Sequence, residues 1–369
     1  MIRIGFYTPS IAFASDLPDV GIFTDHEFVD FRLTCAGATL LEGRYYADNG
    51  SVVVSDIASL VVQCLSAISE LNVAELHIEA YVGEEEADYT DLTCNVLYCD
   101  RSTGLTNPEQ WLRENFLSLT RSRRLAPDDF INLSWYTTER EGIMVRVYCT
   151  FINDKGQRDT YQYVHSGNGL IAHINGIMSE IIMLREVVKH LKDKKKIGSL
   201  VLQSVTVRCG ERSASFFIDP ALSRIVPFYY LNCFGVPEHI ALPRTTTEKI
   251  KSDRSIASLG THSQFYDISH SKEYEVETGG LSRDECVQVE QMLTSPSVRI
   301  PWGRDVSVFE MDFDALLSIL ISDYTSEISD SDEKLNSVKF TWRFAHNRPK
   351  VEPPYSPGIF NDKFNSTFS

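Results

Sequence analysis

The chain has 369 residues, 43% of them hydrophobic and 23% charged, which is the balance of a folded globular protein and not of a disordered one. Its length predicts two domains or three. Its formal net charge of −16 argues against a general nucleic-acid binder, because neutralising phosphates requires an excess of Lys and Arg.

In the first half of the chain, hydrophobic and polar residues alternate with the period of a strand, and turn residues separate the runs. Asp48, Asn49 and Gly50 suit the positive φ angles of a tight hairpin. Short strands with regularly spaced turns are typical of a sandwich or a barrel. The strands that we expect here cover residues 28–33, 51–55, 76–82, 95–98, 130–136, 143–152 and 161–164.

Helical patterns are fewer than strand patterns. The second predicted helix has Asn107 as its N-cap and Pro108 at its first position. The third is the longest, and its last turns are rich in Lys, which suits the negative end of the helix dipole. The fourth begins with Ser282 and has Glu285 three residues later, the capping-box pattern. The predicted helices cover residues 57–68, 108–117, 177–194 and 282–293.

The second half also carries strand patterns, at residues 200–208, 214–219, 228–231, 272–277, 306–309, 316–321 and 337–345. Residues 243–263 are polar and are predicted to form a long exposed loop. The segment after Asn347 is rich in Pro and is predicted to be an extended arm without a core of its own. We expect both segments to be disordered in an isolated monomer and to become ordered against a neighbouring subunit.

The fold class that follows is mainly β, with tandem β-sandwich-like domains, a few short helices and an extended C-terminal arm. We place an N-terminal β-rich domain at residues 1–168, a C-terminal β-rich domain at 169–347 and the arm at 348–369. The boundary falls in the Gly-rich run at residues 166–169. No close internal repeat is evident, although each half pairs a β-meander with a short helix.

Cysteine usage and the N-terminal sequence bear on the cellular compartment. The eight cysteines are widely spread and form no Cys-x-x-Cys pair, which predicts buried free thiols and a reducing compartment. The first residues lack the pattern of a secretory signal, and no apolar stretch is long enough for a membrane span. We therefore expect a protein without a membrane span.

Acidic residues gather in two runs without Lys or Arg. Residues 70–91 contain eight acids, and residues 305–333 contain nine. Such a run is commonly a solvated face of the protein. The alternative is electrostatic matching to a basic partner surface, which would affect the association rate more than the affinity.

Known catalytic motifs are absent from the sequence. It contains no nucleophile elbow, phosphate-binding Gly-Lys-Ser/Thr loop or His-Glu-x-x-His motif, and Gly167 and Gly169 lack the third glycine of a dinucleotide fingerprint. His262, Asp267 and His270 form the densest histidine cluster, but without the fixed spacing of metal ligands. We therefore predict no catalytic, cofactor-binding or metal-binding residues, and no enzyme.

Three weaker signals leave alternatives open. Residues 330–333 faintly resemble a calcium loop but lack its Gly and closing Glu. Paired carboxylates of a hydrolase would meet in space and not in sequence, so an unrecognised hydrolase stays an alternative. Aromatic residues fall in strand-like runs that are most simply core, yet an exposed strip could bind sugar or peptide in host attachment. These aromatics are Trp135, Tyr136, Phe228, Tyr229, Tyr230 and Trp342.

Four stretches, between them, resemble virion structural proteins, tail- or baseplate-associated, of phages and prophages of gut Bacteroidales bacteria. They are GRYYADNG at 43–50, YYLNCFGVPE at 229–238, TGGL at 278–281 followed by a helix and LTSPSV at 293–298, and LNSVKFTWRF at 335–344. The resemblance runs from about residue 28 to residue 349 and carries no active-site residues. It implies a non-enzymatic building block, assembled in the bacterial cytoplasm into a virion, whose partners are copies of itself and other virion proteins.

Overall fold

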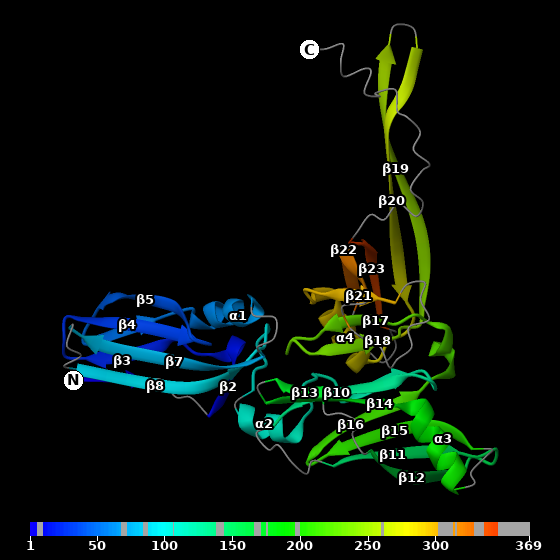
Figure 1. Cartoon of the computed structure of the whole chain (residues 1–369), viewed down its shortest axis with the longest axis horizontal. Helices are drawn as coiled ribbons and strands as arrows, with labels where there is room; N and C mark the ends of the chain where they lie inside the picture. Colours follow the sequence, from blue (N-terminus) through cyan, green and yellow to red (C-terminus); the bar gives the residue numbers. More distant parts are fainter. Residues whose placement is uncertain are drawn as a thin grey trace.

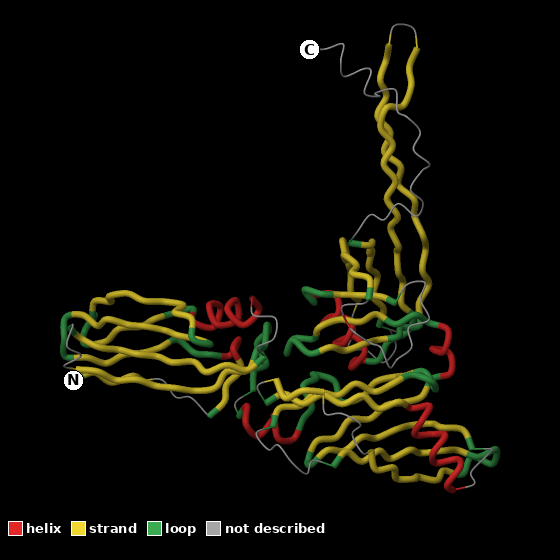
Figure 2. Tube along the Cα trace, viewed as in Figure 1, coloured by secondary structure: helices red, strands yellow, loops and turns green. Residues whose placement is uncertain are grey.

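The computed structural model describes residues 1–5, 10–67, 72–83, 88–105, 107–137, 144–165, 171–174, 176–195, 200–259, 262–301, 313, 316–327 and 336–345. Strands dominate it, as the sequence predicts, and they form five sheets (Figures 1 and 2). The sheets are grouped around three main hydrophobic cores, and each core is described below with the elements that build it.

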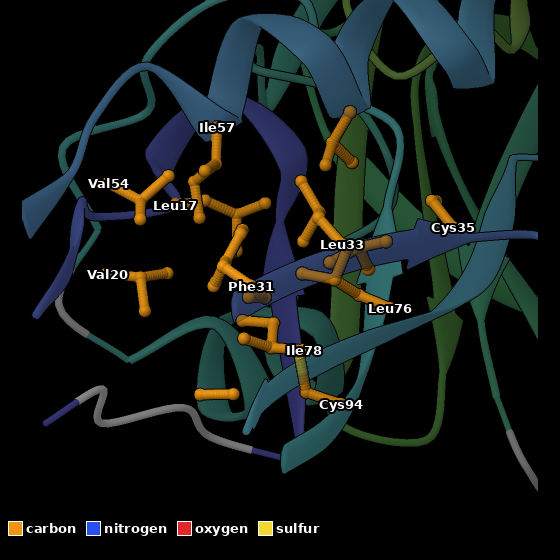
Figure 3. Close-up of a cluster of buried hydrophobic side chains, with 14 of the residues drawn as sticks. Leu17, Val20, Phe31, Leu33, Cys35, Val54, Ile57, Leu76, Ile78 and Cys94 are labelled. Carbon is orange, nitrogen blue, oxygen red and sulfur yellow. The ribbon is translucent and has the colours of Figure 1, made fainter. Parts of the chain in front are cut away.

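The first sandwich packs a three-stranded sheet, in the order β1-β3-β6, against a five-stranded sheet in the order β2-β8-β7-β4-β5. Val20, Phe31 and Ile78 point into the shared core, and Ile57 of helix α1 (Ile57–Ala67) closes it (Figure 3). Alternate residues of β4 are buried, as expected of a strand with one face on a core. The strands are β1 (Ile2–Gly5), β2 (Ile11–Phe13), β3 (Val20–Thr24), β4 (Phe28–Cys35), β5 (Ala38–Tyr46), β6 (Ser51–Val54), β7 (Val73–Val82) and β8 (Asp88–Leu97).

The second sandwich has the same two layers. A three-stranded sheet, β10-β14-β13, faces a five-stranded sheet, β12-β11-β15-β16-β9, and helix α3 (Leu184–Lys195) completes the core. Helix α2 (Pro108–Glu114) precedes it, capped by Asn107 as predicted. The strands are β9 (Ser122–Leu125), β10 (Phe130–Tyr136), β11 (Val145–Ile152), β12 (Arg158–His165), β13 (Ile171–Ile174), β14 (Ile177–Met183), β15 (Val201–Cys209) and β16 (Arg212–Ile218).

The two sandwiches are a structural repeat. In the order in which they lie in the sheet, β2, β8, β7, β4 and β5 of the first correspond to β9, β16, β15, β11 and β12 of the second, and each pair of corresponding strands also has the same rank along the chain. The first pair of each sheet is parallel and the other pairs are antiparallel. In both sandwiches the helix directly follows a strand of the small sheet. Tandem β-sandwich-like folding is therefore present, and it includes a duplication that the sequence analysis missed.

The third module is a single seven-stranded sheet in the order β18-β17-β21-β22-β23-β20-β19. Helix α4 (Arg283–Thr294) packs on it, and Ser282 and Glu285 form the predicted capping box. Strands β19 and β20 run far beyond the rest of the sheet as a two-stranded ribbon (Figure 1). The strands are β17 (Phe228–Leu231), β18 (Pro237–Ile240), β19 (Arg244–Leu259), β20 (His262–Thr278), β21 (Val298–Ile300), β22 (Leu317–Glu327) and β23 (Ser337–Phe344).

Two predicted elements are wrong. Residues 177–183 were predicted to begin a helix, but they form β14, because they pair with β10 along its whole length and alternate in burial. Residues 243–263 were predicted to be an exposed loop, but residues 244–259 form β19 and pair with β20. The strand predicted at 306–309 and the arm at 348–369 lie outside the described residues.

The hydrophobic cores divide the chain into three parts and not into the two predicted domains. Residues on both sides of the predicted 168/169 boundary share the second core, since β11 pairs directly with β15. The predicted C-terminal domain at 169–347 thus contains half of the second sandwich together with the third module. The boundary residues 166–169 themselves are outside the described part of the chain.

Candidate functional site

The β19–β20 ribbon is the most prominent feature of the surface. Its strands stay in antiparallel register from Arg244 opposite Thr278 to Leu259 opposite His262. Strand β23 pairs with β20 only from Tyr274 to Glu277, so no other described strand pairs with the rest of the ribbon. The eleven residues of β19 beyond Glu248 extend roughly 36 Å at the rise of a strand. The ribbon therefore projects into solvent well beyond its sheet (Figure 2).

Ion pairs link the two strands in the lower part of the ribbon. Lys251 contacts Glu273 at 2.7 Å, and Lys249 pairs with Glu275. Exposed ion pairs of this kind contribute little to the stability of the folded protein, because both charges stay hydrated. A two-stranded hairpin without a buried face is marginally stable in water. A long ribbon of this kind therefore gains stability from whatever it contacts.

The outer edge of β19 is accessible. The described side chains from Thr245 to Lys251 are exposed, and Ile250 and Ile256 are 65% and 61% exposed. An extended strand with unpaired N–H and C=O groups and exposed branched apolar residues is a template for pairing with another chain. Natural proteins usually cover or shorten such an edge, whereas the edge of β19 is long and uncovered by any other described strand.

A second open edge lies on β22, three strands away from β19 in the same sheet. Strand β21 pairs with β22 only from Leu317 to Ile319. The rest of β22, from Leu320 to Glu327, pairs on one side with β23 and with no other strand in the described part of the chain. Leu320 and Tyr324 are 46% and 48% exposed there. This segment lies within the acidic run at residues 305–333.

A buried polar network joins the third module to the second sandwich. Glu238 of β18 is 4% exposed and accepts hydrogen bonds from Arg123 of β9 at 2.9 Å, from Asn232 at 2.8 Å and from Tyr230 at 2.9 Å. Asn232 also donates to the carbonyl oxygen of Leu117 at 2.7 Å. Burial, followed by the nearby Glu238 carboxylate, raises the pKa of Tyr230 well above its usual value. The side chains of Arg123, Tyr230 and Asn232 all donate hydrogen bonds to Glu238. The network therefore acts as a rigid joint beneath the sheet that carries the ribbon.

An aromatic stack lies beside this joint. The His239 ring stacks on Phe130 of β10 with 4.3 Å between ring centroids, and its Nε2 lies 3.2 Å from Oδ1 of Asp129. That separation is an ion-pair distance, but the ring is not aligned as a hydrogen-bond donor. Burial alone would raise the pKa of Asp129, but the adjacent His239 and the N–H groups of Phe130 and Ala126 outweigh it and leave the pKa lowered. Sequence analysis missed this contact, because its members are far apart in the chain.

Asp25, which is exposed, and His26 and Asp88, which are half-buried, form a cluster with the geometry of possible metal ligands. The N-terminal ammonium of Met1 lies 2.6 Å from Asp88, and His26 lies 2.7 Å from the same carboxylate. The ammonium, a hydrogen-bond donor to Asp25, lowers the pKa of that carboxyl group. These contacts fasten the chain terminus to the end of the first sandwich.

A cleft of about 600 Å³ lies where helix α2 meets both sandwiches. Glu109 on its wall accepts hydrogen bonds from the amide of Ser10, at 2.9 Å, and from the Ser10 hydroxyl. Arg113 pairs with Glu211 at 3.1 Å across the same wall. The charged groups of the cleft therefore fix α2 between its neighbours.

The structure separates the residues that the sequence singled out for chemistry. His262, Asp267 and His270 lie on β20 opposite Leu259, Ser255 and Ser252, on three different rungs of the ribbon. Residues 167–169 and 330–333 lie outside the described residues. The aromatic residues considered as a binding strip are core instead: Trp135, Phe228, Tyr229, Tyr230 and Trp342 are buried, and Tyr136 is half-buried.

All eight cysteines are free thiols, as predicted, and all except the half-buried Cys64 are buried. Burial raises the pKa of Cys149 to about 12, and burial together with the neighbouring Cys64 raises that of Cys35 to about 12. Thiols with such pKa values are unreactive near neutral pH, since the thiolate is the nucleophile. Cys35 and Cys149 therefore act as small apolar residues of the cores.

Comparison with known proteins gives no family for this chain. No protein-family model matches it, and no curated protein matches it. Among solved structures, it shows a likeness to the crystal structure of CBD12 from CALX1.2, with 10% sequence identity and a TM-score of 0.16 over 56% of this chain and 79% of that chain. A TM-score of this size supports no conclusion about fold or function. Among the helices that the structure describes, none is long and apolar enough to cross a membrane.

Proposed function

We propose that this chain is a non-enzymatic structural protein that assembles with copies of itself, as a tail or baseplate component of a phage virion made in the bacterial cytoplasm. The observation that carries the assembly role is the β19–β20 ribbon. It projects beyond its sheet, keeps the outer edge of β19 open among the described residues, and exposes Ile250 and Ile256. The virion role rests on the sequence resemblance.

The rest of the molecule suits a component that holds the ribbon at a fixed angle. The buried contacts of Glu238 connect the ribbon-bearing sheet to the second sandwich. Phe234, in the turn after Asn232, packs on Phe13 and Trp111, with ring centroids 5.7 Å and 5.4 Å away. These contacts join the third module to the first sandwich and to α2. Forces on the ribbon would therefore reach both sandwiches through packed side chains.

Shortening the ribbon tests the assembly role. In the register of the hairpin, Glu248 lies opposite Tyr274, so Asn-Gly in place of residues 249–273 closes the two strands with a tight turn. We expect the full chain to form oligomers whose mass rises with concentration in light scattering, and the shortened chain, which loses Ile250 and most of the open edge, to associate much more weakly. A full chain that is monomeric at every concentration would overturn the proposal.

A matched variant controls for damage to the fold. Asn-Gly in place of residues 153–157 shortens the β11–β12 hairpin of the second sandwich, where Ile152 lies opposite Arg158. We expect this variant to oligomerise like the full chain, with the same melting temperature within a few degrees. The virion role is checked separately, by mass spectrometry of purified particles from cells that carry the gene. Particles that lack the chain would contradict it.

A further inference from the structure

The sheet of the third module has two open edges that fit each other. We infer that the outer edge of β22, from Leu320 to Glu327, accepts strand β19 of a neighbouring copy, so that copies join head to tail. This inference rests on the proposed self-assembly and specifies which surfaces meet. It also specifies the symmetry, because joining two different edges produces rings or filaments and not closed twofold dimers.

Strand direction is the first argument. Strand β19 is antiparallel to β20, β20 to β23, and β23 to β22. The two outermost strands of this four-stranded part, β19 and β22, therefore run in opposite directions. A second copy placed beside the first in the same orientation brings its β19 antiparallel to β22, which extends the sheet in the antiparallel pattern that it already has.

Strand position is the second argument. One row across the sheet contains Thr247, Glu275, Thr341 and Asp323, and the row two residues away contains Thr245, Glu277, Lys339 and Thr325. The exposed lower part of β19 is thus level with the open part of β22. A neighbour set beside the sheet can pair these two segments only up to about Ile250 of its β19, because β21 occupies the same side of β22 from Ile319 to Leu317. The ribbon beyond that point must bend away from the sheet.

Charge is the third argument, and it decides between two partners for β19. A twofold axis would pair β19 with another β19, also antiparallel. Strand β19 contains four basic and two acidic residues, whereas β22 contains two acids, Asp323 and Glu327, and no base. Lys249 and Lys251 pair with Glu275 and Glu273 of β20, which reduces the excess positive charge at β19. Pairing β19 with itself still brings like charges together, whereas pairing it with β22 brings opposite charges together. The acidic run at residues 305–333 thereby gains the basic partner surface considered in the sequence analysis.

Exposed apolar side chains lie at both edges. Ile250 of β19 and both Leu320 and Tyr324 of β22 are about half exposed or more in the single chain. Strand pairing between copies would bury part of each of them, in addition to the hydrogen bonds along the two edges. Main-chain pairing gives affinity and the side chains give register, as in other cases of strand addition.

Cysteine cross-linking between two variants, each with one exposed cysteine, tests the inference. Thr247→Cys marks β19, Thr325→Cys marks β22, and both exposed positions are introduced into the full-length chain with Cys64→Ser, so that the remaining native thiols are buried. One variant carries a mass tag, and a short bis-maleimide is added. We expect a cross-linked product only when the two variants are mixed, and none from either variant alone.

Control and contrary outcomes are distinct. Thr39→Cys marks the exposed outer strand β5 of the first sandwich, and we expect it to cross-link with neither variant. A product from Thr247→Cys alone would show twofold pairing of β19 and overturn the inference. Oligomers in light scattering without any β19–β22 product would also overturn it, while leaving the proposed function standing. A chain that stays monomeric would overturn both.

Salt dependence gives a second readout. Asp323→Asn removes one acid from the open edge of β22 without changing its shape. We expect this change to weaken association by about two- to fivefold at low salt and to have no effect at high salt, since exposed charges are screened. If wild type and Asp323→Asn associated equally at low salt, the charge argument would fail and the assignment of β22 as the partner of β19 would be overturned.

Discussion

The Glu238 network makes a sharp prediction about the joint beneath the ribbon. Glu238→Ala removes the acceptor of three hydrogen bonds, from Arg123, Asn232 and Tyr230. The guanidinium of Arg123, only 7% exposed, then stays buried without its carboxylate. Breaking a buried ion pair from one side typically costs about 3–5 kcal/mol, because a charge is left uncompensated. We expect a loss of about that size in the unfolding free energy of the third module and second sandwich.

Two further variants separate charge from hydrogen bonding. Tyr230→Phe removes only the 2.9 Å hydrogen bond to Glu238, so we expect a loss of about 1 kcal/mol. The double change Arg123→Met with Glu238→Met removes both charges together, and we expect it to cost clearly less than Glu238→Ala. The expected order of stability is wild type, then Tyr230→Phe, with Glu238→Ala the least stable of the set.

Urea unfolding and native-state hydrogen exchange provide the measurement. Hydrogen exchange reports β9 and β18 separately from the first sandwich. The first sandwich serves as an internal control, because the hydrogen-bond partners of Glu238, which are Arg123, Asn232 and Tyr230, all lie outside it. A loss below about 1 kcal/mol for Glu238→Ala would refute the reasoning, since it would mean that Arg123 finds water or another partner. A double variant as unstable as Glu238→Ala would refute the assignment to the unpaired charge.

Three smaller predictions follow from single contacts. One thiol per native chain should react quickly with a thiol reagent near pH 8, and Cys64→Ser should remove that reaction, because the other seven are buried; urea should expose them all. Asp129→Asn should destabilise the protein above about pH 5, where the native Asp129 is ionised. The difference in unfolding free energy from wild type should shrink as the pH falls to about 2, because a carboxyl group with a lowered pKa stabilises the folded protein only while it is ionised. A pH-independent difference would contradict the role of His239. Ser282→Ala should cost about 0.5–2 kcal/mol in thermal unfolding by removing the capping box with Glu285, and Ser282→Asp should restore most of it.

Elements with local signals could be predicted from the sequence. The capping box of Ser282 and Glu285 and the N-cap at Asn107 depend on contacts within a few residues, and both helices begin where these residues indicate. The Asp48–Gly50 turn has positive φ at Asn49 and Gly50, as its composition predicts. Strand β4 alternates in burial because one of its faces lies on the core.

Residues 177–183 show where local pattern is insufficient. Their apolar positions fit a helix with residues 184–194 as well as they fit a strand. Pairing with β10, about 50 residues earlier in the chain, selects the strand and leaves the helix to begin at Leu184. Tertiary contact thus overrides the helical period, as strand pairing satisfies the backbone hydrogen bonds that a helix would otherwise make.

The ribbon has no sequence signal of the kind that strands with a buried face have. Residues 244–259 show no alternation of apolar and polar residues. Beyond its base the hairpin pairs with no further strand in the described part of the chain. The sequence therefore indicated a polar, exposed segment, and only the register with β20 made it a strand. The same holds for the joint, since Arg123 and Glu238 are 115 residues apart and neither carries a local sign of the other.

The sequence by itself determined the mainly β class, the turns, the helix caps, the free cysteines and the lack of recognisable catalytic motifs, because each depends on residue type or on neighbours a few positions away. The tertiary structure alone decided the duplication of the sandwiches, the three-core organisation, the buried joint and the two open edges. Those features depend on which strands become neighbours across long loops, and that choice is made by the burial of whole faces and not by any short stretch of residues.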